Sequence, residues 1–221
     1  MKNLFIIGDN DALISELKNF LSSKYQFSAS PTDADITIEV TNYDKELKFN
    51  NLKYLEDNIS DDTLIISSSL CIPLTAQLRG VKNFNRLFGA GLYPTFSQVK
   101  GIECTKTNLS SQDYINSIND LFENTIWVED RAGMINLRIV SLIINEAYLV
   151  LQEHTANEND IDTAMKLGTN YPFGPIEWSQ RIGLDVVYNI LQSMYNEYGD
   201  DRYRITPLLR ERYLEWTITN K

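Results

Sequence analysis

Histidine is nearly absent from this sequence, and its scarcity limits the candidates for a general base. His154 is the only histidine among 221 residues. It directly follows a long apolar segment, a position where a cation interacts favourably with the carbonyl groups at the C-terminus of a helix. We therefore interpret His154 as a helix-terminal residue rather than as a substitute base in a catalytic site.

Cysteine is also scarce, because the chain contains only Cys71 and Cys104. Two irregularly placed cysteines are too few for a disulfide framework or a metal site, and they are typical of free thiols in a reducing compartment. The apolar run at the start is too short for a signal peptide and is interrupted by Asp9. No segment has the length of a membrane span. We therefore expect a cytoplasmic protein without a bound metal.

Basic residues are outnumbered, with 20 Lys and Arg against 30 Asp and Glu, and the net charge is −10. This charge argues against nucleic acids and anionic membranes as partners. Hydrophobic residues make up 43% and aromatic residues 11% of the chain, which is ample for a packed core. The length allows one large domain or two small ones.

The first half alternates strand-like and helical segments. An apolar run at residues 4–7 ends at Gly8, and residues 11–21 repeat leucine at helical spacing. Further strands are predicted at 25–27, 35–40, 63–66 and 126–128, and a further helix at 113–122. A strand, a glycine and a helix in succession open a dinucleotide-binding βαβ unit. We therefore predict an α/β, Rossmann-like domain with a mostly parallel sheet.

The glycine-rich fingerprint of such a unit, G-x-G-x-x-G, is degraded here. Gly8 fills the first position, but Asn10 and Leu13 stand at the second and third. The missing glycines would let the backbone approach the pyrophosphate and let helix and strand pack closely. Asp9 and Asp11 add negative charge beside a site that favours anions. Gly8 is therefore the one residue of this turn that we predict to contact a cofactor.

Ser67, Ser68 and Ser69 follow the strand predicted at residues 63–66. Consecutive serines suggest a nucleophile, but no histidine or lysine base accompanies them in the sequence. We interpret this run as a strand-to-helix connection with a serine near the N-cap.

The second half predicts helices. Residues 134–151 are apolar nearly all round, which indicates burial on every side against other helices or a second subunit. In the next helix we predict Asn157 as N-cap, with Asp160 completing a capping box, and Gly168 as the left-handed residue that ends it. Pro175 is expected at the first position of a further helix, which Gly183 ends.

This half resembles the C-terminal helical domain of the 3-hydroxyacyl-CoA dehydrogenases. The matching motifs are Asn145-Glu146-Ala147, Asp160-Ile161-Asp162, Tyr171-Pro172-Phe173-Gly174-Pro175 and Gly183-Leu184-Asp185. The resemblance implies a shortened Rossmann-like domain at residues 1–130, followed by an all-α domain at 131–221. It also implies a homodimer formed through the C-terminal helices.

The resemblance extends to the first half, where the positions of the family's catalytic residues are changed. The catalytic histidine corresponds to Gly91, the asparagine to Leu137 and the substrate-contacting serine to Leu70. Glu103 matches the glutamate that orients the histidine, and Ser68 stands where the family has another asparagine. Glu103 and Ser68 are therefore the remaining catalytic candidates.

The resemblance implies NAD as the cofactor, with Gly8 and Glu39 as binding residues. Glu39 lies in the strand predicted at residues 35–40, which matches a family motif, and Lys48 follows in the next helix, as in the family. Only residues 31–33 stand where the family has another strand and a helical arm, to which part of the acyl-CoA grip is attributed. An acyl-CoA or another small molecule is the ligand that the resemblance implies.

Three hypotheses follow. The first is a non-catalytic or divergent member of the family that acts as a binding or interaction protein. The second is an active, short NAD-dependent dehydrogenase of fatty acid metabolism whose site is rebuilt from groups such as Glu103 and Ser68. The third is a reductase of the wider class with a Rossmann-like and a helical domain, acting on a different small substrate.

Overall fold

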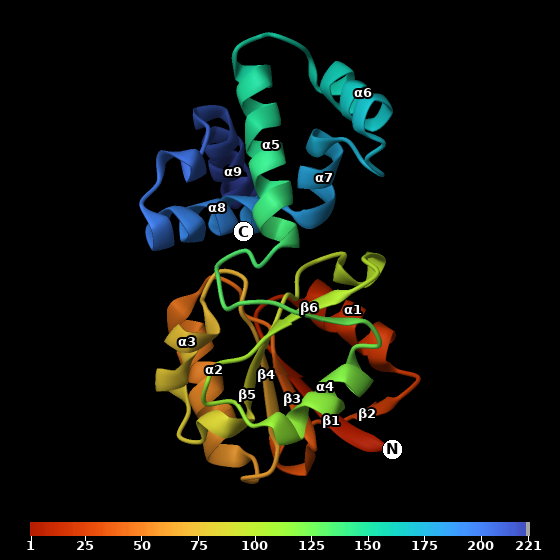
Figure 1. Ribbon diagram of the computed structural model, residues 1–221, viewed down its shortest axis with the longest axis vertical. Coiled ribbons are helices and arrows are strands. Elements are labelled where there is room, and N and C mark those ends of the chain that lie inside the picture. The colour runs from red at the N-terminus through yellow and green to blue at the C-terminus, as the bar shows by residue number, and fades with distance from the viewer. Residues whose placement is uncertain (220–221) are drawn as a thin grey trace. The chain divides into compact units, whose positions relative to one another are not determined.

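The structure, a computed structural model, describes residues 1–219 of the chain (Figure 1). The chain forms two compact units, Met1–Met134 and a second that begins at Ile135. The first unit is an α/β domain with a mostly parallel sheet and the second is helical, which confirms the predicted fold class. The sequence-based boundary, between residues 130 and 131, lies slightly before the observed one.

A single sheet forms the centre of the first unit. Its strands are β1 (Lys2–Ile7), β2 (Tyr25–Phe27), β3 (Ile36–Glu39), β4 (Leu64–Ser68), β5 (Leu87–Ala90), β6 (Ile102–Thr105) and β7 (Thr125–Trp127). Among residues 1–219 the seven strands are ordered β2-β1-β3-β4-β5-β6-β7. All neighbouring strands are parallel except β5 and β6, which are antiparallel.

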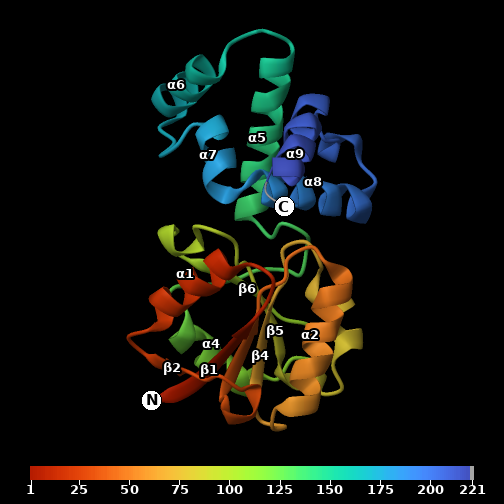
Figure 2. The same cartoon turned by 180° about the vertical axis from the view of Figure 1, so that it is seen from behind.

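Helices cover both faces of this sheet (Figures 1 and 2). Helices α1 (Asp11–Leu21) and α4 (Ile115–Leu121) lie over one face, and α2 (Lys45–Asn58) and α3 (Leu74–Gln77) lie over the other. The chain runs from β1 through α1 to β2, and β3 then lies on the opposite side of β1. In open α/β sheets, ligands bind outside the carboxyl ends of the strands where the order reverses in this way. The switch point here lies between β1 and β3.

The connection from β2 to β3 is short. It contains a 3-10 helix, Pro31–Asp33, that begins after Ser30, whose side chain accepts a hydrogen bond from the Thr32 amide at 3.3 Å. That residues 31–33 stand in place of a strand and a helical arm of the family stays a prediction.

The second unit is built around α5 (Asn136–Gln152), which packs against α7 (Pro175–Ile182), α8 (Leu184–Tyr198) and α9 (Pro207–Thr219). Helix α6 (Glu158–Thr169) packs mainly on α7 (Figure 1). Three neighbouring helices explain why α5 is apolar around most of its circumference. Within residues 1–219, no helix is long and apolar enough to cross a bilayer.

Asp160 and Asp162 lie in one helix but stabilise the starts of two. Asn157 is the N-cap of α6, and its side chain accepts a hydrogen bond from the Asp160 amide at 3.0 Å and donates one to the Asp160 carboxylate at 2.7 Å. The Asp162 carboxylate accepts hydrogen bonds from the Ile176 and Glu177 amides at 2.8 and 3.0 Å. Asp162 therefore caps α7 from a distance in sequence, and it fixes α6 against α7.

Two predicted features of the following turn are confirmed. Pro175 occupies the first turn of α7, and Gly183, with φ of 105°, ends α7 and precedes α8. Gly174 must be a glycine for a separate reason, because a Cβ atom there would overlap the Asp162 side chain.

The predicted end of α6 was wrong. The helix includes Gly168 and continues to Thr169, and Asn170 adopts the left-handed conformation with φ of 57°. Asparagine tolerates this region nearly as well as glycine because its short polar side chain can form local hydrogen bonds. The glycine was therefore a misleading end signal.

Candidate functional site

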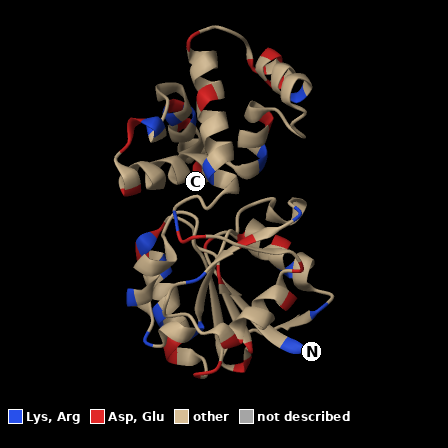
Figure 3. Ribbon diagram, in the orientation of Figure 1, with Lys and Arg blue, Asp and Glu red and all other residues tan. Residues whose placement is uncertain are grey.

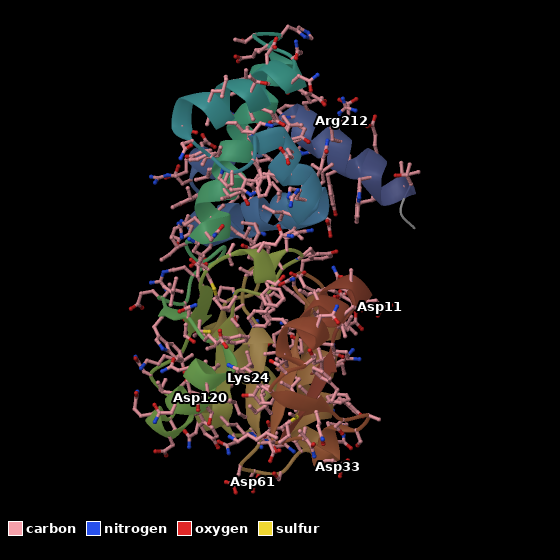
Figure 4. The ribbon with its side chains drawn as sticks, turned by 90° about the vertical axis from the view of Figure 1, so that its right-hand side faces the viewer. Asp11, Lys24, Asp33, Asp61, Asp120 and Arg212 are labelled. Atoms are coloured by element: carbon pink, nitrogen blue, oxygen red, sulfur yellow. The ribbon has the colours of Figure 1, made fainter. Side chains whose placement is uncertain are left out.

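The start of α1 is already capped by the protein itself. The Asn10 side-chain oxygen accepts a hydrogen bond from the Leu13 amide at 2.9 Å. Asp11 occupies the exposed first turn, at the surface of the unit (Figure 4). The N-terminus of a helix binds anions through free amide groups and its dipole. Here a cap and an acid occupy that position.

Gly8 lies at the end of β1, as predicted, but its neighbour is protein. A Cβ atom on Gly8 would lie 2.5 Å from Val40 Cγ2 and 3.3 Å from the Thr41 amide nitrogen. The absence of a side chain therefore lets β1 pack closely against the residues that follow β3. This contact explains the glycine without a bound phosphate.

Asp9 brings a second negative charge to the same turn. Burial raises the pKa of Asp9 above its ordinary value, and the carboxylates of Glu39 and Asp44 raise it further, while a backbone hydrogen bond opposes them. Figure 3 shows that Asp and Glu are distributed over both units. At the switch point their concentration disfavours a further anion.

Glu39 and Lys48 form an ion pair that is completely buried, with both side chains 0% exposed. The Lys48 ammonium also donates hydrogen bonds to Ser67 Oγ at 2.9 Å and to the Ser68 carbonyl at 2.8 Å. The Glu39 carboxylate accepts further hydrogen bonds from Ser67 Oγ and the Thr41 amide, both at 2.9 Å. Burial lowers the pKa of Lys48, and the adjacent Glu39 partly offsets this effect. Glu39, a predicted cofactor residue, therefore lies inside a polar network.

Ser68, a predicted catalytic residue, is also part of the interior. Its hydroxyl donates a hydrogen bond to the Asn42 side-chain oxygen and lies 3.3 Å from the Leu92 carbonyl. Asn42 in turn donates to the same carbonyl at 3.1 Å. The three serines lie at the end of β4 and just after it, whereas Asp130 accepts the first amides of α3 at 2.7 Å. The predicted serine cap is therefore wrong.

Gly91, directly after β5, lies opposite Glu103 of β6. The Gly91 amide donates a hydrogen bond to the Glu103 carbonyl at 2.8 Å, and a Cβ atom on Gly91 would lie 3.6 Å from Glu103 Cβ. The same Cβ would lie 3.1 Å from the sulfur of Met134. Gly91, which the resemblance aligns with a histidine base, therefore faces Glu103, carries no side chain, and has Met134 beside it.

The other two changed positions are apolar and buried. Leu70 is 1% exposed, and its carbonyl accepts a hydrogen bond from the Gly133 amide at 2.7 Å. Leu137, in the second unit, is also 1% exposed. Neither side chain can donate a hydrogen bond to a carbonyl group of a substrate.

Several groups at this site were not predicted from the sequence. The burial of Lys48 depends on acceptors from β3 and β4, and the place of Met134 beside Gly91 depends on a long-range contact. Neither has a local sequence signal. Asp130 had one weak signal, because an acid after a strand is a common capping residue.

The sheet does not place a metal-binding cluster at this site. Within residues 1–219, no group of three or more His, Cys, Asp or Glu side chains is arranged to hold a metal ion. Cys71 and Cys104 are both buried, and burial raises the pKa of Cys104 well above its ordinary value.

The residues at the switch point do not fit a bound dinucleotide. The helix N-terminus is capped by Asn10, the turn carries the charge of Asp9, and the nearby Lys48 ammonium donates all of its hydrogen bonds within the protein. A pyrophosphate needs free amides and positive charge at this place.

Comparison with known proteins shows a family that the chain resembles in sequence. A family model described as the C-terminal domain of 3-hydroxyacyl-CoA dehydrogenase matches residues 133–221. The 3-hydroxybutyryl-CoA dehydrogenase of Clostridioides difficile is 29% identical over 181 residues, which cover 80% of this chain and 64% of that protein. Residues 133–221 therefore match the C-terminal domain of the 3-hydroxyacyl-CoA dehydrogenases, and the chain is similar in sequence to members of that family.

Two further dehydrogenases are similar to this chain, one in sequence and one in fold. The 3-hydroxyadipyl-CoA dehydrogenase of Escherichia coli strain K12 is 44% identical over 92 residues, which cover 42% of this chain and 19% of that protein. The crystal structure of (S)-3-hydroxybutyryl-CoA dehydrogenase PaaH1 from Ralstonia eutropha has the same fold, with a TM-score of 0.78 and 23% identity over 96% of this chain and 93% of that one. This chain spans 64% or less of the length of the two relatives compared by sequence.

Proposed function

We propose that this chain is a non-catalytic or divergent member of the 3-hydroxyacyl-CoA dehydrogenase family that acts as a binding or interaction protein. The proposal rests mainly on Gly91. This residue directly follows β5 and faces Glu103 of β6, at the position where the resemblance puts the histidine base, and the Met134 sulfur lies close to it. Loss of a general base alone costs about 10²- to 10⁴-fold in rate.

The remaining changes act in the same direction. Oxidation of a 3-hydroxyacyl thioester needs a base, a nicotinamide and polar groups around the developing carbonyl. Leu70 and Leu137 cannot supply such polar groups, and the switch point does not fit the cofactor. Each of the three requirements is therefore weakened independently.

The reduction of acetoacetyl-CoA by NADH tests this proposal. We expect no consumption of NADH above the uncatalysed rate, while an active 3-hydroxybutyryl-CoA dehydrogenase assayed in parallel gives a steady rate. Turnover would favour the second hypothesis, an active dehydrogenase of fatty acid metabolism with a rebuilt site. In that case Glu103→Gln should reduce kcat strongly, because Glu103 is the acid that faces Gly91, the position that the resemblance assigns to the base.

We further propose that the second unit pairs with a second copy of the chain through a groove between α5 and α6. The groove has a volume of about 480 Å³. Its lining is mainly apolar and comprises Leu142, Ile143, Ala147, Val150, Ile161, Ala164 and Met165, with Glu146 and Asp160 among the remaining residues. An apolar groove of this kind is typical of a contact surface. The family resemblance supplies the occupant, a second helical domain.

The mass in solution tests this pairing. Light scattering at micromolar concentration should give twice the chain mass of 25.4 kDa. Ala164→Glu places a charge on an exposed position that lines the groove and should shift the protein to monomer. Thr163→Glu adds the same charge on the same helix at an exposed position that does not line the groove, and it should leave the dimer intact. A monomeric unmodified protein would overturn the proposal.

A further inference from the structure

The strongest unexplained feature is the amount of polar interior at the switch point. Glu39, Thr41, Lys48 and Ser67 are each 0% exposed, although polar residues are rarely buried without a reason. Lys48 comes from α2, Glu39 from β3 and Ser67 from β4. Three elements therefore meet through charged and polar groups at the point where a dinucleotide fold binds its ligand.

The network satisfies its own hydrogen-bonding capacity. A lysine ammonium has three donors, and those of Lys48 reach Glu39, the Ser67 hydroxyl and the Ser68 carbonyl. The same carbonyl accepts a hydrogen bond from the Gln77 side chain at 3.0 Å. Lys48 therefore has no donor left for a phosphate or a ribose hydroxyl.

The mouth of the β1 turn is closed by a different set of contacts. Gly8 packs against Val40, and Asn10 binds the Leu13 amide. A phosphate placed here would displace the Asn10 cap and would stand close to the Asp9 carboxylate. Two like charges at such short range repel each other.

The end of β2 gives a ribose no acidic partner. Its final turn is Ser28-Ala29-Ser30, in which the Ser28 hydroxyl donates to the Ser30 carbonyl at 2.6 Å and accepts from the Ser30 amide at 3.1 Å. In dinucleotide-binding units an acidic residue in this region accepts the ribose hydroxyls. Here the serines complete a local turn.

We infer that the switch-point crevice is occupied by the protein's own side chains, so that the first unit binds no dinucleotide and the Glu39–Lys48–Ser67 network holds α2, β3 and β4 together in its place. This inference extends the proposed function from lost catalysis to lost cofactor binding. It concerns a different property, because a protein can bind NADH without turning over a substrate.

Amide NMR of the complete ¹⁵N-labelled chain tests the inference with millimolar NADH, and separately with inorganic pyrophosphate, as the probe. We expect no saturable change in the amide signals of residues 8–13 or 39–42. Saturable changes at residues 8–13 would overturn the inference. Signal changes confined to residues outside 8–13 and 39–42 would support the inference, because they would place binding away from the crevice. An active family dehydrogenase serves as the positive control for the NADH arm.

The results separate the two proposals. Binding at residues 8–13 without reduction of acetoacetyl-CoA would refute only the closed crevice. Turnover together with that binding would refute both proposals. Thermal unfolding gives a second readout, since a ligand that binds the folded state raises Tm as its concentration increases. We expect a Tm that does not depend on NADH.

Discussion

Gly168 and Asn170, at the end of α6, differ in backbone conformation, and replacing each by alanine should therefore change the stability in opposite directions. Gly168 has a helical conformation, and a Cβ atom added to it would meet no atom within 4 Å. Asn170 has φ of 57°, in the left-handed region. Gly168→Ala should therefore stabilise the second unit, whereas Asn170→Ala should destabilise it.

The magnitudes follow from backbone preferences. Alanine in a helix is favoured over glycine by about 0.5–1 kcal/mol, and the position in the last turn puts Gly168→Ala in the lower half of this range. A left-handed conformation costs an ordinary residue about 1–2 kcal/mol, so Asn170→Ala should lose about 1 kcal/mol. In a chain of this size, 1 kcal/mol shifts Tm by about 2–4 °C.

Scanning calorimetry of the unmodified chain and the two variants measures both effects. Asn170→Gly is the matched control, because glycine adopts the left-handed conformation easily and should keep Tm nearly unchanged. The alternative, in which Gly168 is the left-handed residue that ends the helix, reverses the sign of the first substitution. A lower Tm for Gly168→Ala would therefore refute the observed helix end.

Three further predictions concern the two units. Lys48→Met leaves the Glu39 carboxylate buried and unpaired, so the free energy of unfolding in urea should fall by about 3–5 kcal/mol. The control Lys82→Met, at an exposed ion pair, should lower it by at most about 1 kcal/mol. Equal losses in the two variants would contradict the buried network. Burial raises the pKa of Asp9 above its unfolded value, so its ionised form destabilises the folded chain at neutral pH. Asp9→Asn should therefore raise Tm at neutral pH, and the gain should vanish as the pH falls below the ordinary carboxyl range; a gain that persists in acid would refute this cause. Asp162→Ala removes two hydrogen bonds to the start of α7, and a free energy of unfolding in urea that does not fall by about 1–2 kcal/mol would exclude this capping role.

Elements with local signals could be predicted from the sequence. Helix α1 has the predicted bounds, because leucines at helical spacing mark its buried face and a capping residue precedes it. The motif from residue 157 onward was also informative, since Asn157, Pro175 and Gly183 act within one or two turns. The end of α6 failed because glycine and asparagine compete for the same left-handed conformation.

The interior of the site could not be predicted in this way. Glu39 and Lys48 could be singled out in the sequence, but the burial of Lys48 could not be predicted, because it depends on hydrogen-bond acceptors from β3 and β4. The sequence likewise showed a glycine at position 91, yet the space beside it is determined by Met134, which comes from a distant segment. The sequence was enough to predict that the family's catalytic residues are replaced, whereas the groups beside these positions required the fold.

The contact between Gly91 and Met134 has a consequence for any attempt to evolve activity in this chain. Met134 has φ of 49°, an uncommon conformation for a bulky residue, and its sulfur lies 3.1 Å from the point where a side chain on residue 91 would begin. A histidine introduced at residue 91 therefore needs the Met134 side chain to move. A library that varies single positions will sample mostly strained intermediates, whereas one that pairs Gly91→His with Met134→Gly removes the obstruction and the unfavourable backbone in the same step.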